Sequence, residues 1–158
     1  MINKRRMNIG IAADHGGFEL KEFLIAHLKT VGIEVIDFGA FALDKTDDYP
    51  DYIVPLSKAL AEKRIERAIA VCGSGVGASI VANKIAGVRA ALITEYFSAH
   101  QGVEDDDLNM ICLGGRITGA NSAQELVTAF LNAKFSGEER HVRRLEKISK
   151  LELHIHNN

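Results

Sequence analysis

Apolar residues follow two alternating patterns along the chain. Short, nearly continuous apolar runs cover residues 8–14, 33–39, 67–72, 88–94 and 110–114. Between these runs, apolar residues recur at every third or fourth position, the spacing of a helix with one buried face. Apolar strands separated by helices are typical of a parallel sheet covered on both faces. We therefore predict an α/β fold with three layers, a Rossmann-like, doubly wound sheet of five parallel strands.

The helical segments complete this prediction. Helices are expected over residues 18–31, 53–65 and 75–85, in a short stretch ending at 99, and over 126–131 and 138–152. The last of them is highly charged and forms an extra C-terminal helix outside the alternating pattern. Residues 1–6 are interpreted as a loose N-terminal extension, 7–152 as a single domain and 153–158 as a C-terminal tail.

Composition excludes several classes of protein. The 158 residues include 47% hydrophobic and 25% charged residues, ordinary values for a globular domain. A net charge of −2 gives no basic face for nucleic acid. No apolar run approaches the roughly 20 residues that span a membrane. The N-terminus lacks the apolar centre of a signal peptide, and Cys72 and Cys112 are expected to be free thiols. Both features favour the cytoplasm.

The candidate chemistry lies where the predicted strands end, which is where open α/β sheets bind ligands. The third strand ends at Cys72, and the glycine-rich stretch 73–77 follows it. Alternating glycines allow successive N–H groups to point toward one anion. A thiol in that position is in a field that favours the thiolate. A thiolate base beside a row of N–H donors is what forming and holding an enediolate requires. Cys112, inside an apolar strand, is expected to be a buried hydrophobe.

Other interpretations of the loop are weaker. A Walker loop needs lysine before Ser79, where this chain has Ala78, and the same alanine replaces the arginine of the cysteine-phosphatase signature. Gly73, Gly75 and Ala78 fit the dinucleotide-binding pattern, but they follow the third strand instead of the first. A plain strand-to-helix turn, with glycines for close packing, is the structural alternative.

Four separated motifs resemble the ribose-5-phosphate isomerase B family, which includes the galactose-6-phosphate isomerase subunits. They are AADHGG (12–17), DDYPDY (47–52), CGSGVGASIVANKIAGVRA (72–90) and GGRITG (114–119). The resemblance runs from about Met7 to Leu151. It implies a metal-independent, cofactor-free isomerase that interconverts aldose and ketose sugar phosphates through an enediol. It also implies a homodimer or a dimer of dimers with shared active sites.

The resemblance assigns roles to individual residues. Cys72 matches the base, and Ser74 matches a hydroxyl that bonds the reacting oxygens, where many members have threonine. The backbone N–H groups of the loop match the enediolate hole; these belong to Gly73, Gly75, Val76 and Gly77. The groups that contact the sugar and its phosphate match Asp14, His15, Arg116, Arg140 and Arg144. Without the resemblance, the segment around Arg140 would be interpreted as a solvated helix face, and His141 as a surface residue.

One departure from the family pattern concerns ring opening. Family members carry a His-Asn pair before a D-x-N stretch, and here those positions are Asp105 and Asp106. A carboxylate can move the proton if its pKa is raised toward neutrality, and two adjacent acids push one pKa upward. Either Asp105, helped by Asp106, replaces the histidine, or the natural substrate hardly cyclises. His100 is a third candidate, and a solvated acidic loop tip is the structural alternative.

A second class of function also fits the glycine loop. A non-catalytic module that binds a nucleotide or a sugar phosphate would use the loop for phosphate alone. Cys72 discriminates between the two, because a binding module has no need of a thiol there.

Overall fold

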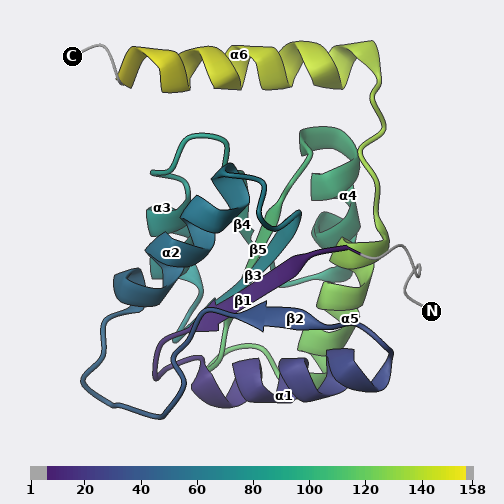
Figure 1. Ribbon diagram of the computed structural model, residues 1–158. Coiled ribbons are helices and arrows are strands. Elements are labelled where there is room, and N and C mark those ends of the chain that lie inside the picture. Colours follow the sequence, from purple (N-terminus) through teal and green to yellow (C-terminus); the bar gives the residue numbers. More distant parts are fainter. Residues whose placement is uncertain (1–6, 156–158) are drawn as a thin grey trace.

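A central sheet of five parallel strands organises the structure, a computed structural model that describes residues 7–155 (Figure 1). The strand order β2-β1-β3-β5-β4 confirms the predicted doubly wound sheet. Because every pair is parallel, all carboxyl ends of the strands lie at one edge. The strands are β1 (Ile9–Ala13), β2 (Val35–Asp37), β3 (Arg67–Cys72), β4 (Ala90–Leu92) and β5 (Met110–Gly114).

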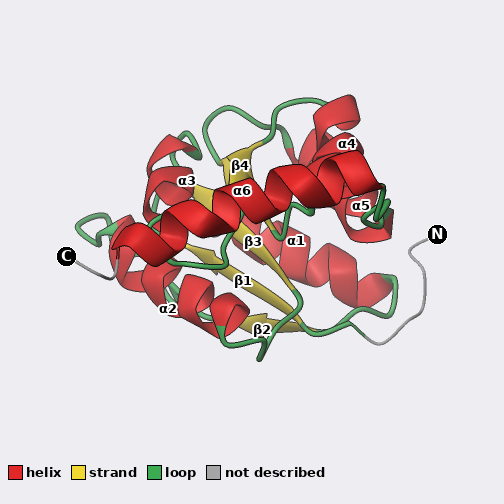
Figure 2. Ribbon diagram, turned by 90° about the horizontal axis from the view of Figure 1, so that it is seen from above, coloured by secondary structure: helices red, strands yellow, loops and turns green. Residues whose placement is uncertain are grey.

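Helices cover both faces of the sheet. One face carries α1, α4 and α5, and the other carries α2 and α3 (Figures 1 and 2). The extra helix α6 lies across the end of the domain where the strands begin (Figure 1). The bounds are α1 (Phe18–Thr30), α2 (Tyr49–Ala61), α3 (Val76–Ala82), α4 (Tyr96–Asp106), α5 (Ala120–Asn132) and α6 (Glu139–Ile155). Among residues 7–155, none of these helices is both long and apolar enough to cross a membrane.

The two faces of the sheet differ in the size of their side chains. On β1, Ile9 and Ile11 pack toward α1, and the small residues Gly10 and Ala12 face α2. A Cβ atom at Gly10 would lie 2.7 Å from Leu56 of α2. The small residues therefore let α2 approach the sheet closely, and the alternation along each strand produces one apolar core on either side.

Several expected element boundaries need correction: the second and fourth strands and helix α3 are shorter than predicted, and three other helices end elsewhere. Helix α2 ends at Ala61, because Lys63 takes a left-handed φ of 57°, so buried Ile65 lies in the following turn. Helix α4 runs to Asp106 instead of ending near 99, since Ala99 and Val103 bury a second turn against the core. Helix α6 extends to Ile155, past the predicted start of the tail. The extension 1–6 and residues 156–158 lie outside the described residues.

Candidate active site

Three loops meet at the carboxyl edge of the sheet. They follow β1, β3 and β5 and touch one another through glycines. The Gly115 N–H donates to the Cys72 carbonyl at 2.8 Å, and the Arg116 N–H donates to the Gly73 carbonyl at 3.0 Å. A Cβ atom at Gly16 would lie 2.8 Å from the Gly73 nitrogen. The loops can therefore meet this closely only because glycine occupies their contact points.

The Cys72 thiol lies at the base of the β3 loop. Its side chain is buried, and the Gly75 N–H donates to Cys72 Sγ at 3.1 Å. The positive end of this N–H group thus points at the sulfur. Ser74 next to it is exposed, and its Oγ accepts a hydrogen bond from the Val76 N–H at 3.4 Å. The loop thus combines a buried thiol and an exposed hydroxyl, and the N–H groups of Gly75 and Val76, two of the predicted anion donors, are bonded to these two side chains.

Cys112 is a chemical contrast to Cys72. It is fully buried within β5, and burial raises the pKa of its thiol well above the ordinary value. The neighbouring Cys72 raises that pKa further. Cys112 therefore stays protonated, and its predicted role as a buried hydrophobe is confirmed.

Asp14 and His15 follow β1 and face the same edge. Asp14 is buried, and its Oδ1 accepts hydrogen bonds from the N–H groups of Gly16 at 2.9 Å and Gly17 at 3.2 Å. Burial raises the pKa of Asp14, although nearby His15 and the two backbone donors oppose that shift. These bonds fix the turn that presents His15.

Asp47 holds His15 from the loop after β2. The His15 Nδ1 lies 2.6 Å from Asp47 Oδ1, and this hydrogen bond is the main cause that raises the pKa of His15. Because Nδ1 is occupied, Nε2 is the ring nitrogen left for a ligand. The sequence-based prediction assigned no role to Asp47. Its only signal was its place at the start of the DDYPDY motif.

Asp14, His15 and Asp47 also form a group with potential metal ligands within 4.8 Å of one another. The donor set has the right composition for a cation. However, Asp14 Oδ1 already accepts two backbone N–H groups, and His15 Nδ1 is bound to Asp47. As folded, the triad consists of a hydrogen-bonded His15–Asp47 pair and an Asp14 carboxylate bonded to its own turn.

A cavity of about 500 Å³ opens beside this triad. Its lining includes the basic side chains of His15, Lys45 and Arg116 and one acidic side chain, Glu19. Arg116 is exposed and borders Gly73, so the cavity adjoins the Cys72 loop, although Cys72 does not line it. A pocket with this charge suits a phosphate group. Lys45 was not among the predicted binding residues.

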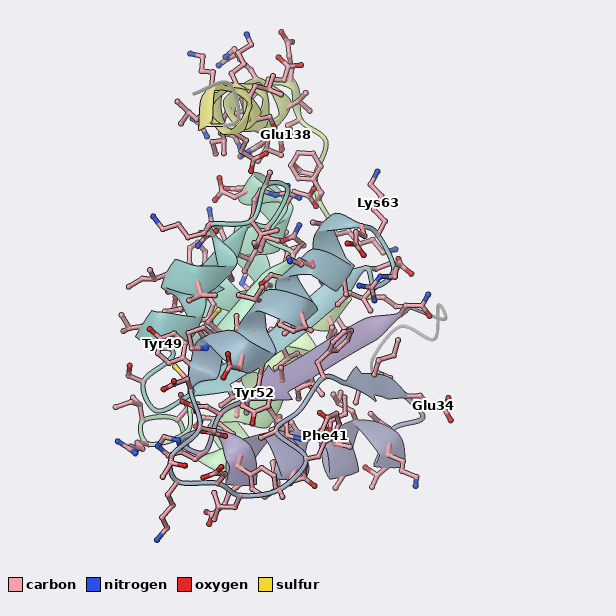
Figure 3. The ribbon with its side chains drawn as sticks, turned by 60° about the vertical axis from the view of Figure 1, so that its left-hand side comes forward. Glu34, Phe41, Tyr49, Tyr52, Lys63 and Glu138 are labelled. Carbon is pink, nitrogen blue, oxygen red and sulfur yellow. The ribbon has the colours of Figure 1, made fainter. Side chains whose placement is uncertain are left out.

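The remaining predicted site residues lie at the opposite edge of the sheet. Asp105 and Asp106 end α4, which leads back to the start of β5, and Arg140 and Arg144 are exposed on α6. Figure 3 shows the same separation: Tyr49 and Tyr52 lie near the carboxyl edge, and Glu138 at the start of α6 lies far above them. The predicted residues therefore form two groups that do not meet within one chain.

The surroundings of the acidic pair differ from a solvated loop tip, the structural alternative for these two residues. Both residues lie in the last helical turn of α4. Asp105 Oδ2 accepts a hydrogen bond from Gln101 Nε2 at 2.7 Å, and Asp106 is exposed beside a groove between β4 and α6. His141, interpreted from sequence as a surface residue, is only 1% exposed and faces Asp105. The surface assignment was wrong because the start of α6 folds onto α4.

His100, the third candidate for ring opening, is held within α4. Its Nδ1 lies 3.1 Å from Glu104 Oε2, and its ring packs against Tyr96 and Phe97. All of these contacts are with residues of α4 itself, and they hold the imidazole more than one helical turn before Asp105.

Comparison with known proteins places this geometry in a family. Residues 9–148 match the family model described as Ribose/Galactose Isomerase. The chain belongs to this family. The resemblance noted from its motifs is thereby confirmed, and so is the expected class of enzyme, a sugar-phosphate isomerase.

Relatives with known names or structures agree along nearly the whole chain. Ribose-5-phosphate isomerase B of Escherichia coli is 40% identical over 91% of this chain and 95% of its own length. The structure of the Clostridium thermocellum enzyme of that name is 40% identical, with a TM-score of 0.90 over 94% of this chain and 99% of that one. The Mycoplasma genitalium enzyme, solved with bound ribulose 5-phosphate, is 38% identical, with a TM-score of 0.87 over 92% of this chain and 95% of that one.

Proposed function

We propose that the protein interconverts ribose 5-phosphate and ribulose 5-phosphate, with Cys72 as the base. One observation carries the assignment: the Gly75 N–H points at Cys72 Sγ in a loop beside a cationic cavity. A thiol that receives an N–H donor, next to a cavity suited to phosphate, fits an aldose–ketose isomerase better than a phosphate-binding module. The named relatives, which are ribose-5-phosphate isomerases, support the choice of substrate.

The reaction follows from the groups in the loop. The Cys72 thiolate takes the proton from C2 of the open-chain aldose, and the C–H electron pair forms the C1=C2 bond of an enediolate. The negative charge moves to O1, where N–H groups of residues 73–77 stabilise it. The Ser74 hydroxyl bonds both oxygens as the O2 proton passes to O1. The Cys72 thiol then returns its proton to C1, and C2 becomes the ketone carbon.

The residues around the cavity are assigned to binding the substrate and its phosphate group. His15 Nε2 and Arg116 donate to the substrate from the cavity, and Asp14 fixes the turn that carries His15. A charged imidazole suits a phosphate dianion, and the bond to Asp47 favours that charge. Lys45 adds a third positive charge to the rim.

A second copy of the chain completes the site in this proposal. Arg140 and Arg144 lie at the edge opposite Cys72, so they can bind substrate only in another subunit's site. Large apolar side chains are exposed around the carboxyl edge and give such a subunit a surface to cover. They include Val76, Ile80, Phe97 and Ile117, between 47% and 68% exposed. We therefore assign a homodimer with shared active sites.

In the shared site, Asp105 opens the sugar ring. It is one-third exposed, and Gln101 holds one of its oxygens. Asp106 lies one residue further on an exposed face, where it can bond sugar hydroxyls. Both acids would reach the substrate from the same subunit as Arg140 and Arg144.

A free Cys72 thiol also needs a reducing compartment, so we assign the enzyme to the cytoplasm.

The decisive experiment mixes the purified protein with ribose 5-phosphate and follows ketose formation by ¹³C NMR. A hexose 6-phosphate and erythrose 4-phosphate serve as comparison substrates. Conversion of at least one of them supports the isomerase. Binding of all three, without conversion of any, would instead support the non-catalytic module.

A further inference from the structure

The buried imidazole of His141 lies against the carboxylate assigned to ring opening. His141 Nε2 is 3.5 Å from Asp105 Oδ1 and 3.9 Å from Glu138 Oε2. Within residues 7–155, neither ring nitrogen of His141 makes a hydrogen bond. Buried polar atoms without partners are rare in folded proteins, because their lost contact with water is not replaced. A solvated helix face, the interpretation from sequence alone, does not explain such a residue.

The backbone fixes this contact from two sides. The Ser136 N–H donates to the Glu104 carbonyl at 2.9 Å, which fastens the segment between α5 and α6 onto the last turn of α4. The His141 N–H then donates to the Glu138 carbonyl at 2.9 Å as α6 begins. These bonds place the imidazole beneath Asp105.

Asp105 consequently has a polar side chain beside each of its carboxylate oxygens, and one of the two donates a hydrogen bond. Gln101 Nε2 donates to Oδ2 at 2.7 Å, and the His141 ring faces Oδ1. The carboxylate keeps one-third of its surface exposed, whereas the imidazole is buried. A reactive group held by surrounding side chains, with one face open, has the preorganised form of a catalytic site.

We propose that His141 is a positioning residue that acts through Asp105 in ring opening. This inference rests on the proposed function. The Asp105 carboxylate takes the proton of the C1 hydroxyl, and that O–H electron pair becomes the C1=O bond. The C1–O4 bond breaks with its electron pair on O4, and the carboxyl group returns the proton to O4. In this step the His141 ring moves the short distance from 3.5 Å to hydrogen-bond contact, and donation from Nε2 to Oδ1 keeps the carboxylate in one orientation as its charge disappears and returns.

The test separates ring opening from isomerisation by using the Cys72→Ser background. Exchange between the α and β furanoses of [1-¹³C]ribose 5-phosphate is measured by NMR exchange spectroscopy. We expect His141→Asn to lower the enzyme-dependent exchange at least tenfold. His141→Gln should retain most of it, because its terminal amide can reach the position of Nε2 and the shorter asparagine cannot. Arg143→Gln, an exposed substitution on the same helix, is the matched control and should change nothing.

Turnover, measured in the protein that retains Cys72, gives the second test. His141→Asn should reduce kcat for ribose 5-phosphate at least tenfold and leave turnover of erythrose 4-phosphate within twofold, since a tetrose 4-phosphate cannot close a furanose through its phosphorylated oxygen. Equal exchange in the Asn and Gln variants, or an equal loss for both substrates, would overturn the positioning role. Failure of the unmodified protein to isomerise any sugar phosphate would instead overturn the proposed function, and this inference with it.

Discussion

His15 Nδ1 lies 2.6 Å from Asp47 Oδ1, and the same oxygen accepts the His15 backbone N–H at 2.9 Å. The loop that carries Asp47 follows β1 closely, since the Ala40 N–H donates to the Ala13 carbonyl at 2.6 Å. One carboxylate thus sets both the backbone and the ring orientation of the histidine. It also raises the pKa of His15, so the imidazolium persists to a higher pH than usual.

We predict that Asp47→Asn returns the pKa of His15 toward the ordinary value for histidine. Phosphate binding should then weaken at a lower pH, so the rise of KM with pH begins earlier than in the parent. The stability contributed by the pair, present below pH 6.5, is lost as the pH rises through the raised pKa of the parent. NMR titration of the His15 ring and KM measured from pH 5 to 9 check both effects.

Asp44→Asn is the matched control, because Asp44 lies in the same loop and bonds Thr46 instead of His15. The same loss of charge there should leave the KM profile nearly unchanged. If the two variants shift the pKa of His15 equally, the shift is caused by the loss of any nearby negative charge, and the hydrogen bond to Asp47 is not its cause.

A second prediction concerns the base. Cys72→Ser should keep the fold and lower isomerisation by about 10²–10⁴-fold, because a hydroxyl is a far poorer base than a thiolate. Iodoacetamide should alkylate Cys72 faster than Cys112, whose thiol burial keeps protonated. Bound substrate should protect Cys72. Cys112→Ala, the matched loss of a thiol, should stay active within a few-fold, and near-parental activity of Cys72→Ser would rule out the assignment.

The features that could be predicted from sequence depend on residues close together in the chain, and on the rule that parallel strands end at the same edge of a sheet. The apolar run before Cys72 and the glycines after it are local signals, and β3 indeed ends at the site edge. Parallel pairing then brings Asp14, Cys72 and Arg116 together without further information. The grouping of these three residues at one edge of the sheet could therefore be predicted from sequence.

Two parts were not available, because they depend on contacts between distant segments. Asp47 reaches His15 only because the loop after β2 folds back along β1. His141 is buried only because the segment before α6 is fastened to α4, whereas most residues around it in the sequence are charged, as on a solvated helix. The end of α4 was also missed, since Gly102, Asp105 and Asp106 have low helix propensity and weaken the helical signal over residues 102–106.

The third prediction tests the turn that aims a donor at the thiol. Gly75 has φ +82°, and a Cβ atom there would lie 2.6 Å from Leu92 and 2.9 Å from the Leu113 carbonyl carbon. Gly75→Ala should therefore lower the free energy of unfolding by about 2–4 kcal/mol, from left-handed strain and overpacking together. Gly87→Ala is the control: φ is +83° and nothing lies within 4 Å, so strain alone should cost about 1 kcal/mol. Equal losses in urea titrations would contradict the packing argument.

The fourth prediction concerns Asp105. Asp105→Asn should lower turnover of ribose 5-phosphate and of a hexose 6-phosphate by at least tenfold, because the amide cannot accept and return a proton. Turnover of erythrose 4-phosphate should remain, since this sugar is already open. His100→Ala should change neither, because that ring is held by Glu104. Two results together would show that the acids have no part in ring opening: the unmodified protein turns over erythrose 4-phosphate fastest, and Asp105→Asn leaves turnover of the cyclic sugars unchanged.

The last prediction addresses the two arginines of α6. Arg140→Ala and Arg144→Ala should each raise KM for the sugar phosphate, with little change in kcat. A charge-assisted hydrogen bond contributes about 1.5–3 kcal/mol, which corresponds to roughly 10–150-fold in binding. Arg143→Ala, an exposed arginine between them, should leave KM unchanged. An equal rise of KM in all three would indicate general loss of positive charge.

Mixing subunits then tests whether these arginines act in the partner's site. In a mixed dimer of Arg140→Ala and Cys72→Ser chains, one site takes Cys72 from the first chain and Arg140 from the second, and is intact. Random mixing in equal amounts makes half of the dimers mixed, each with one working site, so about a quarter of the parental activity should return at low substrate. Native mass spectrometry measures how many mixed dimers form. Mixed dimers without recovered activity would place Arg140 in the same subunit's site, or in none, and the two separated groups of residues would then need another explanation.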